Sequence, residues 1–449
     1  MKLTARTETL SYSCRRCGYR SARWMGFCPQ CREQAALVEQ AESPNRMSRS
    51  ETTVLSATAE RTDVPDRSPV GICEFDRALG GGIVPGAVIL VGGEPGVGKS
   101  TLLLQAADHI AGESGVVLVA TAEESIHQVQ MRARRIGVRS PGVSIASVND
   151  VDDIIGLARD LMPSAVIVDS IQTISSVDVS GSAGGMSQVR ECAARLIHFA
   201  KTSGVPVILV GHVTKDGSIA GPRSLEHMVD VVLYLEGELD RGLRFLRAVK
   251  NRYGALNDVG VFDMTPQGLL EVPDPSGLLV ADRDETAPGS ILFPALDGKR
   301  PLVVEIQALV VESDASQPRR AVNGLAPARV HQILGVLERH VGLPLRRQEV
   351  YVSVMGGIRV TEPAADLAVA LAIVSAFNAE PLGRTAAWGE LGLTGDIRPV
   401  SRPGIRRAEV ERISAGQTVS PDGGVRRLVD AIAKTAVSPL RRGAAGANG

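Results

Sequence analysis

Gly93-Glu94-Pro95-Gly96-Val97-Gly98-Lys99-Ser100 matches the phosphate-binding pattern G-x-x-x-x-G-K-[ST] at every specified position, and Thr101 follows it. The apolar run before it, at 87–91, predicts a buried strand, and residues 102–106 predict the first turns of a helix. Backbone N–H groups and the helix dipole at such a junction bind polyphosphate. Lys99 is expected to reach the β- and γ-phosphates, and the Ser100 hydroxyl to hold Mg²⁺. The predicted ATP or GTP site consists of Gly93, Glu94, Pro95, Gly96, Val97, Gly98, Lys99, Ser100 and Thr101.

The composition restricts the class of protein. The chain has 449 residues, of which 44% are hydrophobic and only 3% aromatic. These values favour aliphatic α/β domains, and the length suggests two or three of them. The 49 basic and 50 acidic residues nearly cancel, so any binding of nucleic acid depends on local patches. We find no apolar run long enough for a membrane span and no signal peptide, and we expect a cytoplasmic location.

Four of the six cysteines form two C-x-x-C pairs, which are Cys14, Cys17, Cys28 and Cys31. Two such pairs provide a tetrahedral thiolate site for Zn²⁺. Two disulfides are the alternative, which a reducing cytosol disfavours. Because so small a module lacks a core of its own, we expect the metal to fold it. Cys73 and Cys192 have no partner at metal-ligand spacing and are predicted to be small buried hydrophobic residues.

Changes in composition along the chain predict its domain boundaries. The predicted order is a zinc module at 10–36, a flexible linker at 37–66, an ATPase domain at 67–272, a second linker at 273–289, a third domain at 290–437 and a disordered tail at 438–449. Within the ATPase domain, apolar runs predict strands at 87–91, 116–120, 143–146, 165–168, 205–210 and 229–235. Short runs that are apolar throughout predict an α/β domain whose parallel sheet is covered on both faces.

Carboxylates follow two of the predicted strands. Asp169 follows the strand at 165–168, and beside a phosphate-binding loop we expect it to order Mg²⁺ together with Ser100. The alternative for Asp169 is a helix cap. Glu123 and Glu124 follow the strand at 116–120 and offer a general base for water. Strand alternation does not decide which of the two points inward; Glu123 is favoured and Glu124 is the alternative.

Two loops leave the same edge of the predicted sheet, where α/β proteins bind ligands. Residues 175–187 are rich in Gly and Ser and predict a loop that is not rigid. Residues 212–223 carry Lys215 and Arg223. In a ring of subunits both loops line the channel and can grip a nucleic-acid backbone. The alternative is an ordinary surface loop.

Several longer segments resemble the bacterial RadA (Sms) family of DNA repair proteins. They are residues 71–86, 168–173, 212–217, 225–230 and the turn Lys250-Asn251-Arg252-Tyr253-Gly254. The similarity covers residues 10–437. Tyr253 stands where the family commonly has Phe, and Arg32-Glu33-Gln34 stands where an aromatic residue usually follows the second cysteine pair. Both departures leave the predicted zinc ligands unchanged.

The resemblance implies a RecA-like ATPase core that forms hexameric rings and moves on single-stranded and branched DNA. It also implies that the protein acts with the RecA recombinase and extends heteroduplex by ATP-driven branch migration. Lys99 matches the Walker A lysine of the family, Asp169 its Walker B carboxylate and Glu123 its water-activating base. Lys250 and Arg252 lie in the motif that couples ATP and DNA across neighbouring subunits, where a guanidinium supplied in trans raises the rate by roughly 10³–10⁵-fold. A solvated basic turn is the alternative for these two residues.

The third domain resembles the Lon proteolytic domain in residues 352–357, 361–368 and 389–399. Lon-type proteolysis needs a serine nucleophile and a lysine base. Asp366 stands at the position of the nucleophile, and the lysine region holds Arg406 and Arg407. Because aspartate has no hydroxyl and arginine stays protonated, we expect this fold without protease activity.

Two functions of different classes therefore remain. The first is a DNA-dependent ATPase that drives branch migration in recombinational repair. The second is a nucleotide-switched scaffold that binds DNA, hydrolyses ATP slowly and organises partners without translocating. An ATP-dependent protease is the least favoured.

Overall fold

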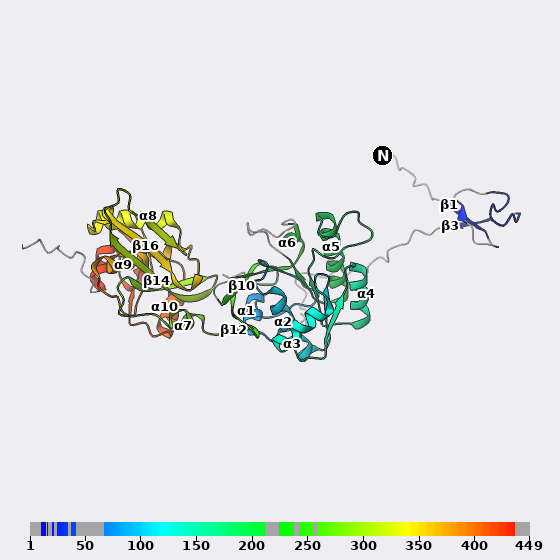
Figure 1. Cartoon of the computed structure of the whole chain (residues 1–449), viewed down its shortest axis with the longest axis horizontal. Coiled ribbons are helices and arrows are strands. Elements are labelled where there is room, and N and C mark those ends of the chain that lie inside the picture. The colour runs from blue at the N-terminus through cyan, green and yellow to red at the C-terminus, as the bar shows by residue number, and fades with distance from the viewer. Residues whose placement is uncertain are drawn as a thin grey trace, which may run out of the picture. The chain divides into compact units, whose positions relative to one another are not determined.

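The computed structural model describes residues 10–14, 16, 20–21, 25–34, 37–41, 67–211, 224–237, 242–254 and 258–435. The chain divides into two compact units, Met1–Val64 and Pro65–Gly449 (Figure 1). Residues 42–66 of the predicted first linker and the predicted tail at 438–449 lie outside the described residues.

The first unit contains a small antiparallel sheet with the strand order β2-β1-β3. Its strands are β1 (Leu10–Cys14), β2 (Arg20–Ser21) and β3 (Leu37–Ala41). β3 pairs with β1 along its whole length, from Leu37 opposite Cys14 to Ala41 opposite Leu10. The zinc module therefore continues to residue 41, past the boundary predicted at residue 36.

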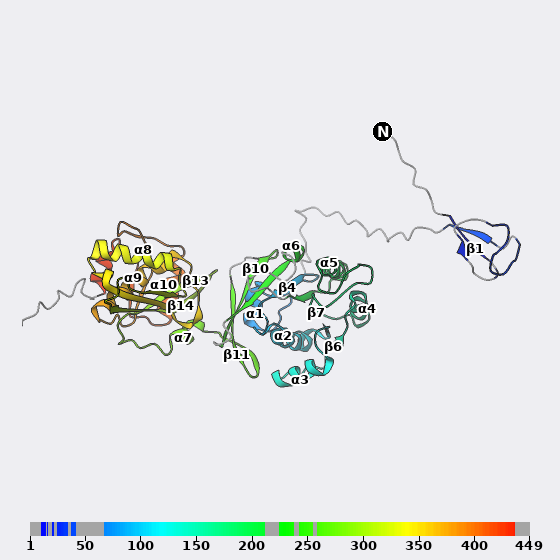
Figure 2. The same ribbon diagram turned by 45° about the horizontal axis from the view of Figure 1, so that its top comes forward.

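In the second unit, the described residues up to Glu271 form a nine-stranded sheet in the order β12-β11-β10-β9-β4-β8-β7-β5-β6. Its strands β11, β10, β4, β7 and β6 are labelled in Figure 2. From β9 to β6 neighbouring strands are parallel. These strands are β9 (Val231–Glu236), β4 (Val88–Gly92), β8 (Val207–Val210), β7 (Ala165–Asp169), β5 (Val117–Thr121) and β6 (Val143–Ser147). Each begins and ends within two residues of the strand predicted from its apolar run.

Helices cover both faces of the parallel strands, which is why the strands are apolar throughout. In β4, Ile89 and Val91 pack into one core cluster, whereas Val88 and Leu90 pack into another. The first face is covered by α1 (Cys73–Leu79), α2 (Lys99–Ser114) and α3 (Ile126–Ile136). The second is covered by α4 (Val151–Leu161), α5 (Met186–Ser203) and α6 (Ser224–Met228). This arrangement confirms the predicted α/β core.

Beyond β9 the sheet continues with antiparallel strands that the sequence did not predict. They are β10 (Leu243–Asn251), β11 (Val259–Thr265) and β12 (Gly268–Glu271). Phe245 of β10 and Val261 of β11 share one core cluster with apolar residues of the third domain. α7 (Pro275–Val280) then lies within the segment predicted as the second linker. The ATPase domain and the third domain are thus joined by a common core.

The third domain is built around the buried helix α9 (Asp366–Asn378), which packs against a mixed sheet. Within the described residues the strand order is β15-β16-β14-β13-β17-β20. The strands are β13 (Ser290–Asp297), β14 (Arg300–Glu312), β15 (Arg320–Asn323), β16 (Gln348–Val354), β17 (Thr385–Ala387) and β20 (Gln417–Val419). The other elements are α8 (Pro327–Val336), α10 (Pro403–Arg412), α11 (Leu428–Lys434) and the ribbon of β18 (Glu390–Leu391) with β19 (Ile397–Arg398). No helix among the described residues combines the length and the apolar character needed to cross a membrane.

Candidate functional site

The phosphate loop lies between a strand and a helix, as predicted. β4 ends at Gly92 and α2 begins at Lys99. Gly98 has a φ of 113°, in the left-handed region that side chains disfavour, and a Cβ there would meet the side chain of Met264. Gly98 is also the N-cap of α2 and offers no side-chain cap. The first N–H groups of α2 are therefore available to bind an anion.

The Lys99 ammonium lies against this loop and is only 4% exposed. Its Nζ donates to the carbonyl oxygens of Gly93 at 2.8 Å and Glu94 at 3.0 Å. Burial lowers the pKa of Lys99, and the charges of Asp169 and Glu123 oppose that shift. The structure thus brings the predicted lysine and both predicted carboxylates into one site.

Ser100 and Asp169 offer oxygen ligands for Mg²⁺ in the same place. Asp169 ends β7, directly opposite Thr121 at the end of β5. Burial raises the pKa of Asp169, a hydrogen bond from the Ser100 side chain lowers it, and the charge of Glu123 raises it again. The hydroxyl and the carboxylate line one small cavity together with Thr121. Because Mg²⁺ prefers a few oxygen ligands of this type, these residues fit the metal.

The structure separates the two candidate bases. The Ser170 hydroxyl, next in sequence to Asp169, donates to Oε1 of Glu123 at 2.5 Å. Glu124 instead forms an ion pair with Arg132 of α3. The geometry therefore favours Glu123, because it is held beside Asp169 while Glu124 is held by the neighbouring helix.

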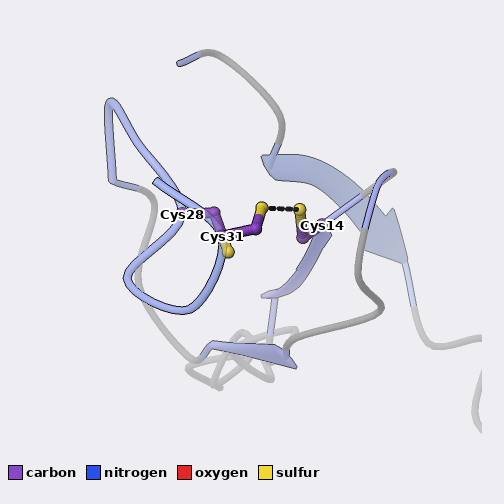
Figure 3. A group of neighbouring side chains, drawn as sticks. All are labelled: Cys14, Cys28 and Cys31. Atoms are coloured by element: carbon purple, nitrogen blue, oxygen red, sulfur yellow. Dashed lines mark hydrogen bonds between the residues drawn. The ribbon is translucent and has the colours of Figure 1, made fainter. Parts of the chain in front are cut away.

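Three of the four predicted zinc ligands converge in the first unit. The sulfur atoms of Cys14, Cys28 and Cys31 lie within 4.8 Å of one another, and those of Cys14 and Cys31 are 3.6 Å apart (Figure 3). A tetrahedral zinc–thiolate site with bonds of about 2.3 Å spaces its sulfurs by roughly 3.8 Å. The described thiols thus fit Zn²⁺, while Cys17 lies outside the described residues.

The chain turns sharply after the second cysteine pair. The N–H of Arg32 donates to the carbonyl of Cys28 at 2.8 Å, and Arg32 has a left-handed φ of 58°. This turn brings Cys28 and Cys31 to the same side.

Of the other two thiols, Cys192 is buried as predicted, but Cys73 is exposed. The prediction for Cys73 was wrong because this residue begins α1, whose buried face is formed further along by Phe75, Ala78 and Leu79.

Zinc content provides a direct test of this module. We expect about one Zn²⁺ per chain, released by a thiol-reactive reagent and measured with a colorimetric chelator. Cys28→Ser is expected to lower the zinc content to near zero, because it removes a buried thiolate ligand. Cys73→Ser is the matched control and is expected to retain the metal. A wild-type chain without zinc, or equal zinc loss in both variants, would contradict the assignment.

Comparisons with known proteins agree with this site. A model of the AAA domain matches residues 58–218, and a model of the rubredoxin metal binding domain matches residues 12–39. The DNA repair protein RadA of Bacillus subtilis is 43% identical over 93% of both chains. RadA of Escherichia coli K12 is 42% identical over 95% of this chain and 98% of its own. The chain belongs to the RadA family.

The predicted fold class is thereby confirmed: a RecA-like P-loop core with an N-terminal zinc module and a C-terminal α/β domain. The chain is an ATPase of this DNA repair family, and its cofactors are ATP, Mg²⁺ and Zn²⁺. Among solved structures, a KaiC-like protein from Pyrococcus horikoshii OT3 matches 46% of this chain and 99% of its own, at 22% identity and a TM-score of 0.39.

In this RadA-family chain, the segment predicted as the turn 250–254 comprises the last two residues of β10 and the bend after it, and it lies against the end of α6. Nζ of Lys250 donates to the carbonyl oxygens of Glu226 at 2.7 Å, Val229 at 2.8 Å and His227 at 3.2 Å. It thereby satisfies carbonyls that a helix leaves unpaired at its carboxyl end. Burial lowers the pKa of Lys250, and so does the neighbouring charge of Arg252. Lys250 thus has a positioning role within its own chain.

Arg252 is held more loosely than Lys250. Its side chain is 54% exposed, and its contacts with Asp230 and the carbonyl of His227 are 3.5 and 3.4 Å long. Asp230 also accepts from Lys201 at 2.5 Å and from the N–H of Val88 at 3.0 Å. Lys250 is therefore held by three hydrogen bonds, whereas Arg252 makes only long side-chain contacts. The predicted DNA contacts Lys215 and Arg223 lie outside the described residues.

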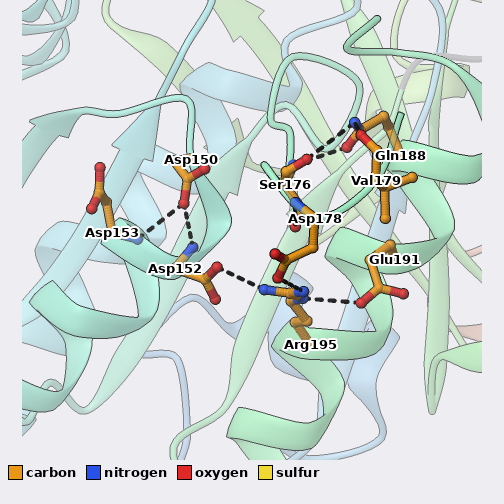
Figure 4. A network of polar contacts seen from close by, with 9 residues as sticks. All are labelled: Asp150, Asp152, Asp153, Ser176, Asp178, Val179, Gln188, Glu191 and Arg195. Atoms are coloured by element: carbon orange, nitrogen blue, oxygen red, sulfur yellow. Dashed lines mark hydrogen bonds and ion pairs between the residues drawn. The ribbon is translucent and has the colours of Figure 1, made fainter. Parts of the chain in front are cut away.

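The Gly- and Ser-rich loop at 175–187 is anchored near its start by hydrogen bonds to the helix that follows it. Gln188 of α5 is 2% exposed and hydrogen bonds to backbone atoms of Ser176 at 2.8 Å and Val179 at 2.5 Å (Figure 4). Arg195, two turns further along α5, forms ion pairs with Asp152, Asp178 and Glu191. Neither residue could be predicted from the sequence, because their partners lie outside any motif. The only local signal was the pair of polar residues on the helix that follows the loop.

The third domain of this RadA-family chain holds ion pairs at Asp366 and Arg406, two of the residues that the sequence predicts in place of the Lon nucleophile and base. Asp366 accepts from Arg329 at 2.8 Å and from the N–H of Leu391 at 3.0 Å. Burial raises the pKa of Asp366, and the bond from Arg329 opposes that rise. Arg406 is fully buried and forms an ion pair with Glu362. Asp366 and Arg406 are thus each held by an ion pair within the third domain.

Proposed function

We propose that this protein is a DNA-dependent ATPase of recombinational repair, which uses ATP to drive branch migration on intermediates made by RecA. Its DNA would be single-stranded and branched, its assembly a homo-oligomeric ring, and its location the cytoplasm. Lys99, Glu123 and Asp169 hydrolyse ATP, and Lys215 and Arg223 contact the DNA backbone. The observation that carries the proposal is the contact between the turn 250–254 and α6, in a chain of the RadA family.

This contact lies between the proposed DNA-binding residues 212–223 and the ATP site. α6 directly follows residues 212–223, which carry the proposed DNA contacts. At the other end of α6, Asp230 accepts from the N–H of Val88, the first residue of the strand that leads into the phosphate loop. Lys250 holds this junction through the carbonyl oxygen of Val229, whereas Arg252 makes only a long contact with Asp230. We therefore propose that a change at residues 212–223 on DNA binding is transmitted to the ATP site through α6 and the hydrogen bond between Asp230 and Val88.

The exposure of Arg252 supports a role between subunits. A guanidinium that stabilises the transition state at the ATP site of a neighbouring subunit must be free to reach beyond its own subunit. Arg252 meets this condition, because its side chain is half-exposed and its contacts are long. Lys250, with three carbonyl partners, is the residue that holds α6. We therefore propose different roles for them: Arg252 acts in trans, and Lys250 acts in cis.

The test combines ATP turnover with strand processing. We expect single-stranded DNA to raise turnover, Lys99→Ala to abolish hydrolysis, and Arg252→Ala to lower DNA-stimulated turnover by up to roughly 10³-fold. Both variants should stop branch extension on a RecA-made joint molecule while DNA binding, followed by fluorescence anisotropy, persists. Arg346→Ala, which removes an arginine that is 91% exposed, is the control and should behave as wild type.

Two other outcomes would decide against the motor. If DNA leaves turnover unchanged and Arg252→Ala behaves like Arg346→Ala while DNA is still bound, the protein is a nucleotide-switched scaffold. If no DNA is bound at all, the assignment to DNA repair through direct DNA contact fails.

A further inference from the structure

A buried arginine lies behind the phosphate loop, outside every motif of the sequence. Arg244, the second residue of β10, is only 3% exposed. Arginine is almost never fully buried unless its guanidinium has specific partners. The partners of Arg244 therefore indicate why it is there.

One of these partners belongs to the phosphate loop. Nε of Arg244 donates to the carbonyl oxygen of Val97 at 3.2 Å, across 147 positions of sequence. Its Nη1 donates to the carbonyl oxygens of the two preceding residues, Leu243 at 3.0 Å and Gly242 at 3.4 Å. The guanidinium thus links the loop to the start of β10.

The orientation of the Val97 carbonyl matters for the site. A loop that binds phosphate turns its N–H groups toward the anion, so its carbonyl groups point away from it. Val97 is only 2% exposed, and a buried carbonyl needs a donor. Arg244 supplies this donor on the outer side of the loop.

Neighbouring strands also pack closely against two glycines of the loop. A Cβ on Gly93 would lie 2.5 Å from the carbonyl oxygen of Leu235 in β9. A Cβ on Gly98 would lie 3.0 Å from Leu269 in β12 and would also meet Met264 in β11. These contacts are steric, whereas the contact of Arg244 is polar and charged.

Arg244 keeps its charge in this buried position. Burial lowers the pKa of Arg244, and the charge of Asp263 on the adjacent strand β11 opposes that shift. An arginine guanidinium stays protonated in proteins. Arg244 is therefore a permanent donor to the carbonyl oxygen of Val97.

We propose that Arg244 is a positioning residue of the nucleotide site, which holds the Val97 carbonyl outward and sets the affinity for the phosphates of ATP. It acts through the loop and touches no reacting atom. The proposal rests on the ATP site alone, and not on the DNA motor proposed above.

The test uses the full-length protein without DNA, so that its result is independent of the motor. We expect Arg244→Gln to raise the KM for ATP and the Kd for a fluorescent ATP analogue by about tenfold, with kcat changed less than about twofold. Arg244→Lys retains the charge but not the planar donor, and an increase of about threefold is expected. Arg247→Gln, three residues along the same strand, contacts Asp297 and Glu236 instead and is expected to leave KM unchanged.

Two measurements distinguish a specific effect on ATP binding from a general loss of structure. The unfolding midpoint without nucleotide reports stability, and a rise in KM with little change in kcat reports weaker binding. Arg244→Gln with wild-type KM and Kd overturns the proposal, and so does an equal rise in KM for Arg247→Gln. A variant that loses kcat while KM is unchanged also overturns it. If Arg244→Gln does not fold, Arg244→Lys decides: a folded Lys variant with wild-type KM contradicts the proposal.

Discussion

Replacing Glu123 with Gln is expected to lower the rate of ATP turnover by roughly 10²–10⁴-fold, the usual contribution of a general base. The amide cannot take a proton from water, but its oxygen can still accept the hydrogen bond that Ser170 donates to Glu123. The site should therefore keep its shape and its affinity for ATP. Single-turnover hydrolysis and binding of a fluorescent nucleotide analogue measure the two effects separately.

Glu124→Gln is the matched control for this experiment. Glu124 is next in sequence and carries the same charge, but it forms an ion pair with Arg132. We expect its replacement to change turnover by less than about tenfold, because the pair holds α3 and does not contact water at the phosphate. If Glu124→Gln stops hydrolysis and Glu123→Gln does not, the two roles are reversed.

The choice between these neighbours shows where sequence reasoning reached its limit. Both glutamates follow β5 in a turn, where the alternation of a strand no longer applies. The deciding contact comes from Ser170, which is 47 positions away in sequence. By contrast, Asp169 could be predicted from the sequence, since it ends an apolar strand in a fold whose parallel strands all end at the same edge of the sheet as the phosphate loop.

The same distinction holds for the fold. The parallel strands were predictable because burial on both faces makes them apolar throughout, as in Ala165–Asp169. β10 was missed because Arg244, Arg247 and Lys250 interrupt its apolar pattern. Each of these charges is satisfied by a different distant partner: Val97 of the phosphate loop, Asp297 of the third domain and the end of α6. Local patterns contain no information on such partners.

The third domain is attached to the ATPase domain through a buried ion pair. Arg300 at the start of β14 pairs with Glu74 of α1, and the two side chains are 8% and 3% exposed. Arg300 also donates to the carbonyl oxygen of Val259 at 2.7 Å, and Glu74 accepts from the N–H of Val261 at 2.8 Å. Arg77, whose side chain is 45% exposed, also pairs with Glu74 at 3.3 Å. The other partners of this pair lie inside the protein, where an uncompensated charge is costly.

Arg300→Met is therefore expected to lower the free energy of unfolding by up to about 3–5 kcal/mol, because the buried Glu74 carboxylate loses its buried counter-ion and keeps only the longer pair with the half-exposed Arg77. Denaturant unfolding followed by the fluorescence of Trp388, which is buried in the third domain, measures the loss. The double variant Glu74→Gln/Arg300→Met should recover part of it, since no charge is then left unpaired. Arg346→Met, which breaks an exposed pair with Glu338, should have almost no effect. Equal stability of Arg300→Met and Arg346→Met would contradict the assignment.

This ion pair also bears on activity, because α1 supports the turn 250–254. The side-chain amide of Asn251 donates to the carbonyl oxygen of Leu79, the last residue of α1, at 2.9 Å. Loosening α1 from the third domain should therefore disturb that turn more than the phosphate loop, which has its own supports in β9 to β12. In conditions where Arg300→Met is still folded, we expect DNA-stimulated turnover to fall more than basal turnover. Equal losses in both would show that the third domain stabilises the ATPase core without acting on its coupling to DNA.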